Sequence, residues 1–414
     1  MERRERLRKR LLPLASALLV ILVLAYTVST LTAAIPAAST NSAQSAVATV
    51  TINEVELPWP AEPSSIAVWI DAKTTQGSGL RSNGNNAETV MASLAKLITI
   101  VVSLDAHPYD PNDKATYTLG AKDVGYYRQV LAQDGSTAPV VEGVKLTRYQ
   151  MMQLMMLPSA NNYALSYVDW IFGSMETFRK EAQAYFDKHK LESIRLNEPS
   201  GLDLNNVATA SDLSQIGQLA LAYPVLAEIM AQQTAEIPGI GTIKNSNFFL
   251  GESGVRGMKT GTTSAGRNLM LARDVTVGDR TVTFVITTLG QPSAEARIAV
   301  NEALIAGVAG DVQEVTVATD GEVVGDATLW NGAEVQLLVK GSASTVLTLD
   351  EAAKRKAVFG EVRAGMNAGD KIGLLNIATP TGKISLPVVL AESIPEPDGW
   401  WRLTHPFAVW GWMR

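Results

Sequence analysis

The chain has 414 residues, of which 46% are apolar and 18% charged, as is typical of globular protein with two or three domains. A net charge of −6, without a basic patch, argues against a nucleic-acid partner. There is no cysteine, which excludes disulfides, thiol catalysis and cysteine-based zinc sites. The three histidines, His107, His189 and His405, are scattered, so we expect no histidine-based metal site, no Ser-His-Asp triad and no cofactor.

A basic stretch followed by an apolar one occupies residues 1–35. Residues 1–10 carry six Lys or Arg side chains against two Glu, and residues 11–35 carry no charge. An apolar run of about 25 residues can span a bilayer with some tilt, and the basic flank predicts a cytoplasmic N-terminus. A cleaved signal peptide is the alternative, although its apolar region is usually about 7–15 residues long. We favour an uncleaved anchor, and in both cases the body of the protein is exported.

The patterns that follow predict a tether and then a domain of mixed structure. Residues 36–60, rich in Ala, Ser and Thr at their start, are interpreted as a flexible tether. Residues 61–310 begin with a strand pattern, continue through helical patterns, and end with strand patterns at 268–273 and 281–287 and a helix at 294–308. This order predicts an α+β fold, in which helices cover an antiparallel sheet and a helical cluster is inserted.

Two further regions complete the chain. Residues 311–392 contain short alternating segments separated by Gly, Asp and Asn, which predict a small all-β domain. Residues 393–414 are rich in tryptophan, which favours membrane interfaces because its ring is amphipathic. Two interpretations of this tail stay open, namely packing on its own domain and contact with the membrane interface.

A serine and a lysine stand three residues apart where an apolar helical pattern begins, at Ser93 and Lys96. On a helix, positions i and i+3 share one face, so a lysine without its proton could take one from the hydroxyl. This form of activated nucleophile needs no histidine. Alone the pattern is weak, since about one chance S-x-x-K is expected in a chain of this size. The alternative is that Ser93 caps the helix and Lys96 is solvated.

Two further triplets follow in order along the chain. The S-x-N triplet from Ser159 to Asn161 comes directly after a helix that a capping box opens. The K-T-G triplet stands on the first late strand and comprises Lys259, Thr260 and Gly261, with Thr262 next. Each triplet is weak alone. The ordered set is typical of penicillin-binding proteins and class A β-lactamases, and the chain has a single S-x-x-K.

Residues of about 60 to 310 therefore resemble the serine D-Ala-D-Ala carboxypeptidases, the low-molecular-mass penicillin-binding proteins of the peptidase S11 type. Residues 197–202 and 208–212 resemble the family's N-x-x-G-L and T-A-x-D segments, and residues 244–249 resemble its N-x-N segment. The resemblance implies a β-lactamase/penicillin-binding-protein-like catalytic domain on the extracytoplasmic side of the cell membrane. It also implies that β-lactam antibiotics are covalent inhibitors.

The resemblance gives roles to the first two triplets. Ser93 would attack the terminal D-Ala-D-Ala bond of peptidoglycan stem pentapeptides, with Lys96 as the base. Ser159 would relay the proton to the leaving D-alanine. Asn161 would hold Lys96 and the substrate amide.

The third triplet would bind substrate. Lys259 and Thr260 would bind the terminal carboxylate, and Gly261 would let the substrate backbone approach the strand closely. The backbone N–H groups of Ser93 and Thr262 would form the oxyanion hole.

Other functions stay open at this point. A D,D-transpeptidase or endopeptidase shares the acylation chemistry and differs in its acceptor or its bond. A class A β-lactamase needs a Glu in an E-x-x-L-N context, but Gly201 stands at the acidic position and Glu198 has the wrong spacing. An inactive wall-binding module is disfavoured because all three triplets are intact. We assign no role to the polar loop from Asp71 to Glu88.

Overall fold

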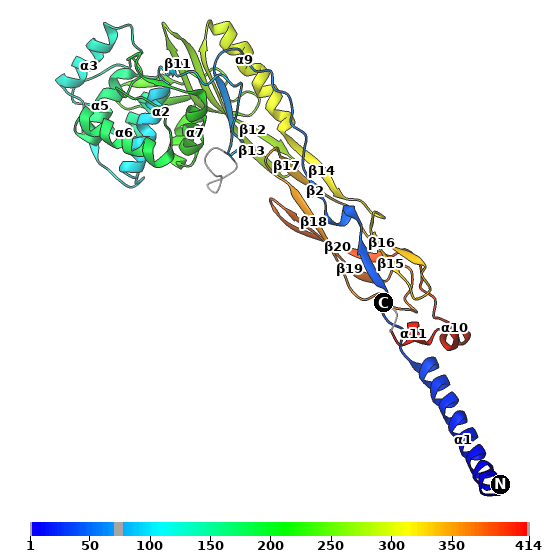
Figure 1. Ribbon diagram of the computed structural model, residues 1–414. Helices are drawn as coiled ribbons and strands as arrows, with labels where there is room; N and C mark the ends of the chain where they lie inside the picture. Colours follow the sequence, from blue (N-terminus) through cyan, green and yellow to red (C-terminus); the bar gives the residue numbers. More distant parts are fainter. Residues whose placement is uncertain (1, 70–77, 412–414) are drawn as a thin grey trace. The chain divides into compact units, whose positions relative to one another are not determined.

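The computed structural model describes residues 2–69 and 78–411, with side chains from residue 11 onwards. The chain forms two compact units (Figure 1). The larger unit comprises residues 53–313 and 348–350, and the smaller unit comprises residues 1–52, 314–347 and 351–414. The polar loop from Asp71 to Glu88 lies partly outside the described residues.

The larger unit is built on a five-stranded antiparallel sheet. Its strands, in spatial order, are β11 (Val255–Thr263), β12 (Gly266–Val277), β13 (Arg280–Gln291), β3 (Ser64–Trp69) and β4 (Arg81–Ser82). The hairpin between β12 and β13 turns at Gly278, whose φ of +60° favours glycine. Strand β11 is at the edge of the sheet, so its outer backbone groups have no neighbouring strand.

Helices cover both faces of this sheet. The Ser214 hydroxyl on α7 (Ala210–Leu221) donates to the Thr287 hydroxyl at 2.9 Å, and the Asn301 amide on α9 (Ala294–Gly307) donates to the Thr288 hydroxyl, also at 2.9 Å. Successive residues of a strand point to opposite faces, so α7 and α9 lie on opposite sides of β13. The predicted α+β fold is confirmed.

The helices of the larger unit are α2 (Leu94–Ala106), α3 (Ala121–Leu131), α4 (Arg148–Met156), α5 (Asn161–Phe172), α6 (Met175–His189), α7 (Ala210–Leu221), α8 (Pro224–Met230) and α9 (Ala294–Gly307), with a short 3₁₀ helix at Val308–Asp311. Three small sheets pair β5 (Thr89–Val90) with β8 (Val207–Ala208), β6 (Thr116–Thr118) with β7 (Lys145–Thr147), and β9 (Thr234–Ile237) with β10 (Gly241–Lys244).

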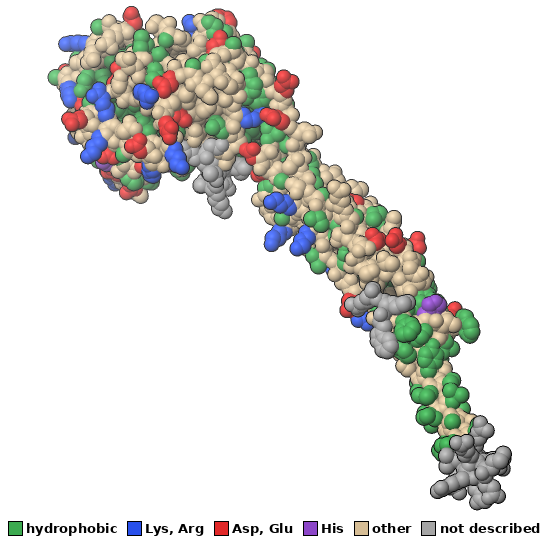
Figure 2. Space-filling view, in the orientation of Figure 1, with side chains coloured by type: hydrophobic (Ala, Val, Ile, Leu, Met, Phe, Trp, Pro, Cys, Tyr) green, Lys and Arg blue, Asp and Glu red, His purple; other side chains and the backbone are tan. Residues whose placement is uncertain are grey.

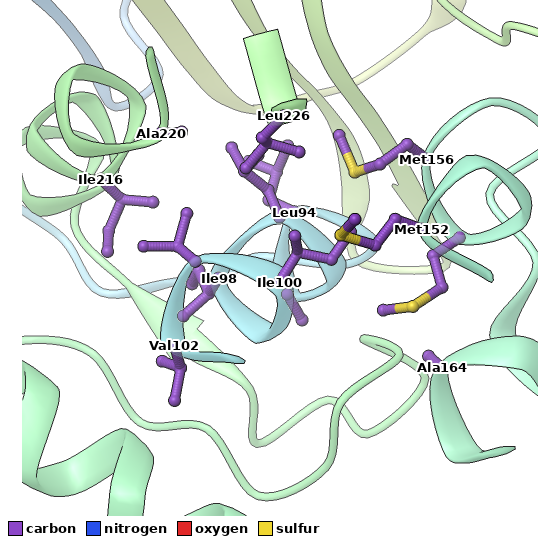
Figure 3. Close-up of a cluster of buried hydrophobic side chains, with 14 of the residues drawn as sticks. Leu94, Ile98, Ile100, Val102, Met152, Met156, Ala164, Ile216, Ala220 and Leu226 are labelled. Atoms are coloured by element: carbon purple, nitrogen blue, oxygen red, sulfur yellow. The ribbon is translucent and has the colours of Figure 1, made fainter. Parts of the chain in front are cut away.

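Helix α2 lies in the middle of the core of the larger unit. Every residue from Leu94 to Leu104 is buried, so the helix is enclosed on all sides. Its apolar side chains pack among residues of α4, α5, α7 and α8, including Met152 and Met156, which fill core space (Figure 3). Because Lys96 belongs to this helix, its amine is carried into the core.

The smaller unit contains a seven-stranded antiparallel sheet, as predicted for a small all-β domain. In spatial order its strands are β1 (Ser39–Ser42), β15 (Val323–Thr328), β16 (Glu334–Val339), β20 (Gly382–Leu390), β19 (Lys371–Thr379), β18 (Ala353–Phe359) and β2 (Thr49–Val50). A separate pair joins β14 (Val312–Ala318) to β17 (Ala343–Thr348).

The structure corrects the expectation that residues 36–60 form a flexible tether. Strand β1 pairs with β15, and β2 pairs with β18, so this segment supplies both edge strands of the seven-stranded sheet. A short 3₁₀ helix, Gln44–Val47, lies between them. A composition rich in Ala, Ser and Thr is typical of linkers, but here the partner strands satisfy the backbone groups of β1 and β2 and hold them in place.

The N-terminal helix and the C-terminal tail pack against each other within the smaller unit. Helix α1 (Glu2–Thr32) includes 22 residues, Leu11–Thr32, that by length and composition are apolar enough to cross a membrane. The tail forms α10 (Gly399–Thr404) and α11 (Pro406–Val409). The Arg402 guanidinium donates to the Ala33 carbonyl at 2.7 Å, and the rings of Tyr26 and Trp410 meet edge to face at 6.0 Å. Figure 2 shows apolar side chains over both segments.

Candidate active site

Ser93 lies in a constrained turn immediately before α2. Its side chain does not cap the helix; it accepts a hydrogen bond from Lys96 Nζ at 2.8 Å instead. The preceding residue, Ala92, has a φ of +51°, a left-handed conformation that is unusual for a residue with a side chain. Gly201 approaches this turn so closely that a Cβ there would lie 1.9 Å from the Ala92 carbonyl oxygen. The turn that presents Ser93 is therefore held from outside by another backbone segment.

Lys96 is a buried amine without a carboxylate bonded to it in the described part of the chain. Its side chain is fully enclosed, and Nζ also donates to the Ser200 carbonyl at 2.6 Å. Burial, and then the positive charge of Lys259, hold the pKa of Lys96 well below its usual range, while the Glu198 carboxylate opposes them. This environment favours the neutral amine, which is the form that accepts a proton. The alternative of a solvated lysine is wrong.

Ser159 lies in the loop between α4 and α5, and Asn161 is the first residue of α5. Helix α4 begins with the predicted capping box, formed by Thr147 and Gln150. Ser159 has a φ of +63° and is 6% exposed, and its Oγ has no partner among the described residues. The buried Asn161 Oδ1 likewise has none within the described chain. A buried polar group without a partner costs about 1–3 kcal/mol, so these two groups are suited to meet a ligand.

The K-T-G triplet lies on the edge strand β11 beside the Ser93 turn. A Cβ at Gly261 would lie 3.0 Å from Ala92 Cβ, so glycine lets the two segments approach. Lys259 is 1% exposed, and its Nζ donates to the Thr260 carbonyl at 3.1 Å. Burial, and then the charge of Arg297, lower the pKa of Lys259 to about 7. Thr262 is exposed.

Hydrogen bonds also connect the second triplet's loop to the third triplet's strand. The Ser246 N–H donates to the Leu157 carbonyl at 2.9 Å, and the Ser246 and Thr260 hydroxyls share a hydrogen bond of 2.7 Å. Ser246 belongs to the segment that resembles the N-x-N motif. Ser246 and Leu157 thus link the loop of the second triplet to β11, and Ala92 links β11 to the turn at the start of α2.

Sequence reasoning missed two groups at this site. Ser200 supplies the second hydrogen-bond acceptor of Lys96 through its backbone, and a side-chain motif does not report a carbonyl. Arg297 on α9 donates to the Thr262 hydroxyl at 3.5 Å, and its guanidinium lies 5.1 Å from the centre of the Phe248 ring. Arg297 thus adds a second cation beside β11, but a single arginine within a helix carries no sequence signal.

Within the described residues, no group of three or more His, Asp or Glu side chains is placed to hold a metal ion. The chemistry that the site offers rests on the serine hydroxyl, the buried amine and the cations beside β11.

An antiparallel sheet covered by helices, with a buried Ser-Lys pair beside an edge strand, defines the class of serine acyl-transfer enzymes that work without histidine. Within that class, the chain belongs to the D-alanyl-D-alanine carboxypeptidase family, peptidase S11, whose family model matches residues 53–289. The predicted resemblance is confirmed, and the protein is a peptidase of this family.

Individual relatives agree with this assignment. The chain is 25% identical over 239 residues to a D-alanyl-D-alanine endopeptidase of Escherichia coli (strain K12), covering 55% of this chain and 72% of that protein. It is 24% identical over 340 residues to the D-alanyl-D-alanine carboxypeptidase DacC of the same organism, covering 79% and 84%. The crystal structure of penicillin binding protein 5 from Haemophilus influenzae shares the fold, with a TM-score of 0.53 and 18% identity, over 84% of this chain and 100% of that one.

Proposed function

We propose that the protein removes the terminal D-alanine from peptidoglycan stem pentapeptides through an acyl-enzyme on Ser93. The observation that carries the proposal is the fully buried Lys96 amine, 2.8 Å from the Ser93 hydroxyl. An amine kept neutral at that distance is a base for the hydroxyl proton, so it activates the nucleophile without a histidine.

The proposed reaction has two stages. Ser93 Oγ attacks the carbonyl of the terminal D-Ala-D-Ala bond while its proton passes to Lys96, and the Ser93 and Thr262 N–H groups stabilise the oxyanion. The C–N bond then breaks, and Ser159 relays the proton to the departing D-alanine amine. Water hydrolyses the resulting ester and restores Ser93. The unpartnered Ser159 hydroxyl supports its part in this relay.

Substrate binding is assigned to β11 and to the second triplet. The substrate backbone would lie along the edge of β11, and Gly261 lets this strand lie close to the Ser93 turn. Lys259 and Thr260 would bind the terminal carboxylate, and that negative charge would favour the protonated form of Lys259. Asn161 would hold both the substrate amide and Lys96. Its amide oxygen has no partner among the described residues and is therefore available for such a contact.

Transpeptidase or endopeptidase activity within the same family is the second candidate, because one relative is named an endopeptidase. A β-lactamase that deacylates through Glu198 is disfavoured, since that carboxylate already accepts hydrogen bonds from its own loop. β-Lactam antibiotics would acylate Ser93 and inhibit the enzyme.

We propose that the N-terminal helix is an uncleaved membrane anchor, and that the larger unit and the rest of the smaller unit lie on the extracytoplasmic side. Three hydrogen bonds support its retention. Arg402 donates to the carbonyls of Leu31 and Ala33 at the end of the helix, and the Tyr26 hydroxyl donates to the Leu403 carbonyl. Trp400 and Phe407 remain 75% and 52% exposed beside that end, which suits an interfacial tail. The mass of the membrane-extracted protein tests this, because a cleaved chain would lack residues 1 to about 35.

The decisive test of the enzyme function uses the purified protein with a pentapeptide stem and with a fluorescent penicillin. Free D-alanine and a covalent penicillin adduct are expected from the wild type, and Ser93→Ala is expected to give neither. Absence of an adduct on the wild type would refute the catalytic proposal. An adduct with cross-linked product or cleaved cross-links, and no free D-alanine, would establish the second candidate.

A further inference from the structure

The loop of residues 198–206 contacts both Lys96 and the turn that presents Ser93. Its Ser200 carbonyl accepts a hydrogen bond from the Lys96 amine at 2.6 Å. Its Gly201 backbone lies so close to the Ala92 carbonyl that a Cβ at Gly201 would clash with it. At the end of the loop, the Asn206 carbonyl accepts the Met91 N–H at 2.9 Å. The position of this loop therefore fixes the geometry of the reacting pair.

Glu198 folds this loop around its own carboxylate. Its two oxygens accept the backbone N–H groups of Ser200 (2.8 Å), Gly201 and Asp203 (3.3 Å), and the side-chain amide of Asn206 at 2.9 Å. Four donors on one carboxylate make a rigid turn, because each charged hydrogen bond is stronger than a neutral one. Two of the donors, Ser200 and Gly201, belong to the same residues that contact Lys96 and Ala92.

We propose that Glu198 is the positioning residue of Lys96: it aims the Ser200 carbonyl at the amine, holds Gly201 against the Ser93 turn, and brings a negative charge close to the buried amine. The inference rests on the proposed function, in which Lys96 is the base. Glu198 acts through Lys96 and the loop and does not touch the substrate.

The charges around Lys96 predict the direction in which its pKa changes when the Glu198 charge is removed. Ser93 faces the amine from the start of α2, Lys259 from β11, and the Ser200 carbonyl and Glu198 from the loop. Lys259 disfavours the protonated amine, whereas Glu198 favours it and raises the pKa of Lys96 against the effect of burial. Loss of the Glu198 charge therefore lowers the pH at which Lys96 becomes neutral and able to accept a proton.

The test is the pH profile of acylation by a fluorescent penicillin in Glu198→Gln. Gln keeps the shape of the side chain but replaces one acceptor oxygen with an NH₂ group, so at least one loop N–H loses its acceptor. The rate on the plateau is expected to fall roughly tenfold. The acid limb of the profile is expected to move to lower pH by about one unit. If Glu198 only folded the loop, Glu198→Gln would lower the acylation rate on the plateau but would not shift the acid limb of the pH profile.

Two matched variants complete the experiment. Glu198→Asp keeps the charge and shortens the side chain, so its plateau is expected to fall while its acid limb stays with the wild type. Should Glu198→Gln not fold, a Glu198→Asp plateau equal to that of the wild type would by itself overturn the positioning role. Glu192→Gln removes an exposed acid a few residues earlier and is expected to leave both quantities unchanged.

Each result decides the matter. An acid limb of Glu198→Gln that coincides with the wild type overturns the inference, as does an equal limb shift in Glu198→Asp. If the wild type itself is not acylated, the proposed function fails, and that result is distinct from failure of the role of Glu198.

Discussion

The two units each bury a cation, and they treat it in opposite ways. In the smaller unit, Arg355 is 8% exposed and its guanidinium contacts the Glu322 carboxylate at 2.7 Å. In the larger unit, Lys96 is fully buried, and its hydrogen-bond acceptors are a hydroxyl and a carbonyl. A buried charge needs a counter-charge or loses its proton, and arginine cannot lose one in practice. The first arrangement maintains a charge, and the second makes a base.

The largest expected effect comes from removing the amine of Lys96. Lys96→Met keeps the length of the side chain and its burial but removes the proton acceptor of Ser93. Because general base catalysis contributes about 10²–10⁴-fold, the rate of acylation by a fluorescent penicillin is expected to fall by about 10³-fold. The free energy of unfolding is expected to remain within about 1 kcal/mol of wild type or to rise, since functional sites sacrifice stability.

This result would sharpen the contrast between the units, because activity would be lost without loss of stability. A variant that is acylated at the wild-type rate would show that another group takes the Ser93 proton, and the account of Lys96 as a base would be wrong.

Lys259 provides the next effect, which depends on pH. Its pKa is lowered to about 7, so in the free enzyme the charge that would bind the substrate carboxylate is lost as the pH rises through that value. The rate constant kcat/KM for D-alanine release is expected to fall above pH 7. Lys259→Met is expected to lose this alkaline limb and to reduce kcat/KM by roughly 10²-fold, as for one charge-assisted contact.

Stability measurements check the same pKa independently. The folded pKa of about 7 lies below the ordinary lysine value of 10.5, so between these values the unfolded chain binds more protons. The penalty for burying Lys259 is therefore complete below pH 7 and disappears above pH 10.5. Relative to Lys259→Met, the wild type is expected to become more stable as the pH rises through this window. The free energies of unfolding of the wild type and Lys259→Met, measured in urea, should therefore differ by an amount that changes between pH 6 and pH 10. A constant difference over this range would contradict the lowered pKa of Lys259.

A smaller effect is expected where the loop backbone meets the Ser93 turn. Gly201 and Gly143 have nearly equal positive φ values, +86° and +84°, but only Gly201 has atoms in the space that a Cβ would occupy. Alanine at Gly143 is expected to cost about 1–2 kcal/mol of backbone strain and to leave acylation unchanged. Alanine at Gly201 carries the same strain plus a clash with the Ala92 carbonyl, and is expected to slow acylation by about tenfold. Equal acylation rates in the two variants would show that the Ser93 turn does not depend on Gly201.

The residues that could be predicted from the sequence are those whose relations are local. The spacing of Ser93 and Lys96 fixes a shared helix face, and the Val277–Asp279 turn fixes the hairpin behind the K-T-G strand. The fold class and the eight proposed site residues followed from such patterns and from the family resemblance. The order of the three triplets carried more information than any one of them.

The relations that could not be predicted join segments far apart in the chain. The Ser200 carbonyl lies 104 residues from Lys96, and it acts through the backbone, which side-chain motifs do not report. Residues 39–42 looked like a linker because their partners, in β15, come 285 residues later, as for Asn41 and Asp326. Pairing across such distances depends on the complete fold, and short alternating segments do not specify their partners.

The least effect on catalysis is expected from breaking the paired cation of the smaller unit. Glu322→Gln removes the counter-charge of Arg355. Since Glu322 is 24% exposed and water can partly replace it, the free energy of unfolding is expected to fall by only about 1–2 kcal/mol. The acylation rate at Ser93 is expected to be unchanged. The Lys96→Met and Glu322→Gln variants together therefore form a crossed test, in which one loses activity and keeps stability and the other does the reverse. A Glu322→Gln protein that unfolds at the wild-type urea concentration would mean that the ion pair contributes nothing, and the contrast between a maintained charge and a discharged one would then rest on Lys96 alone.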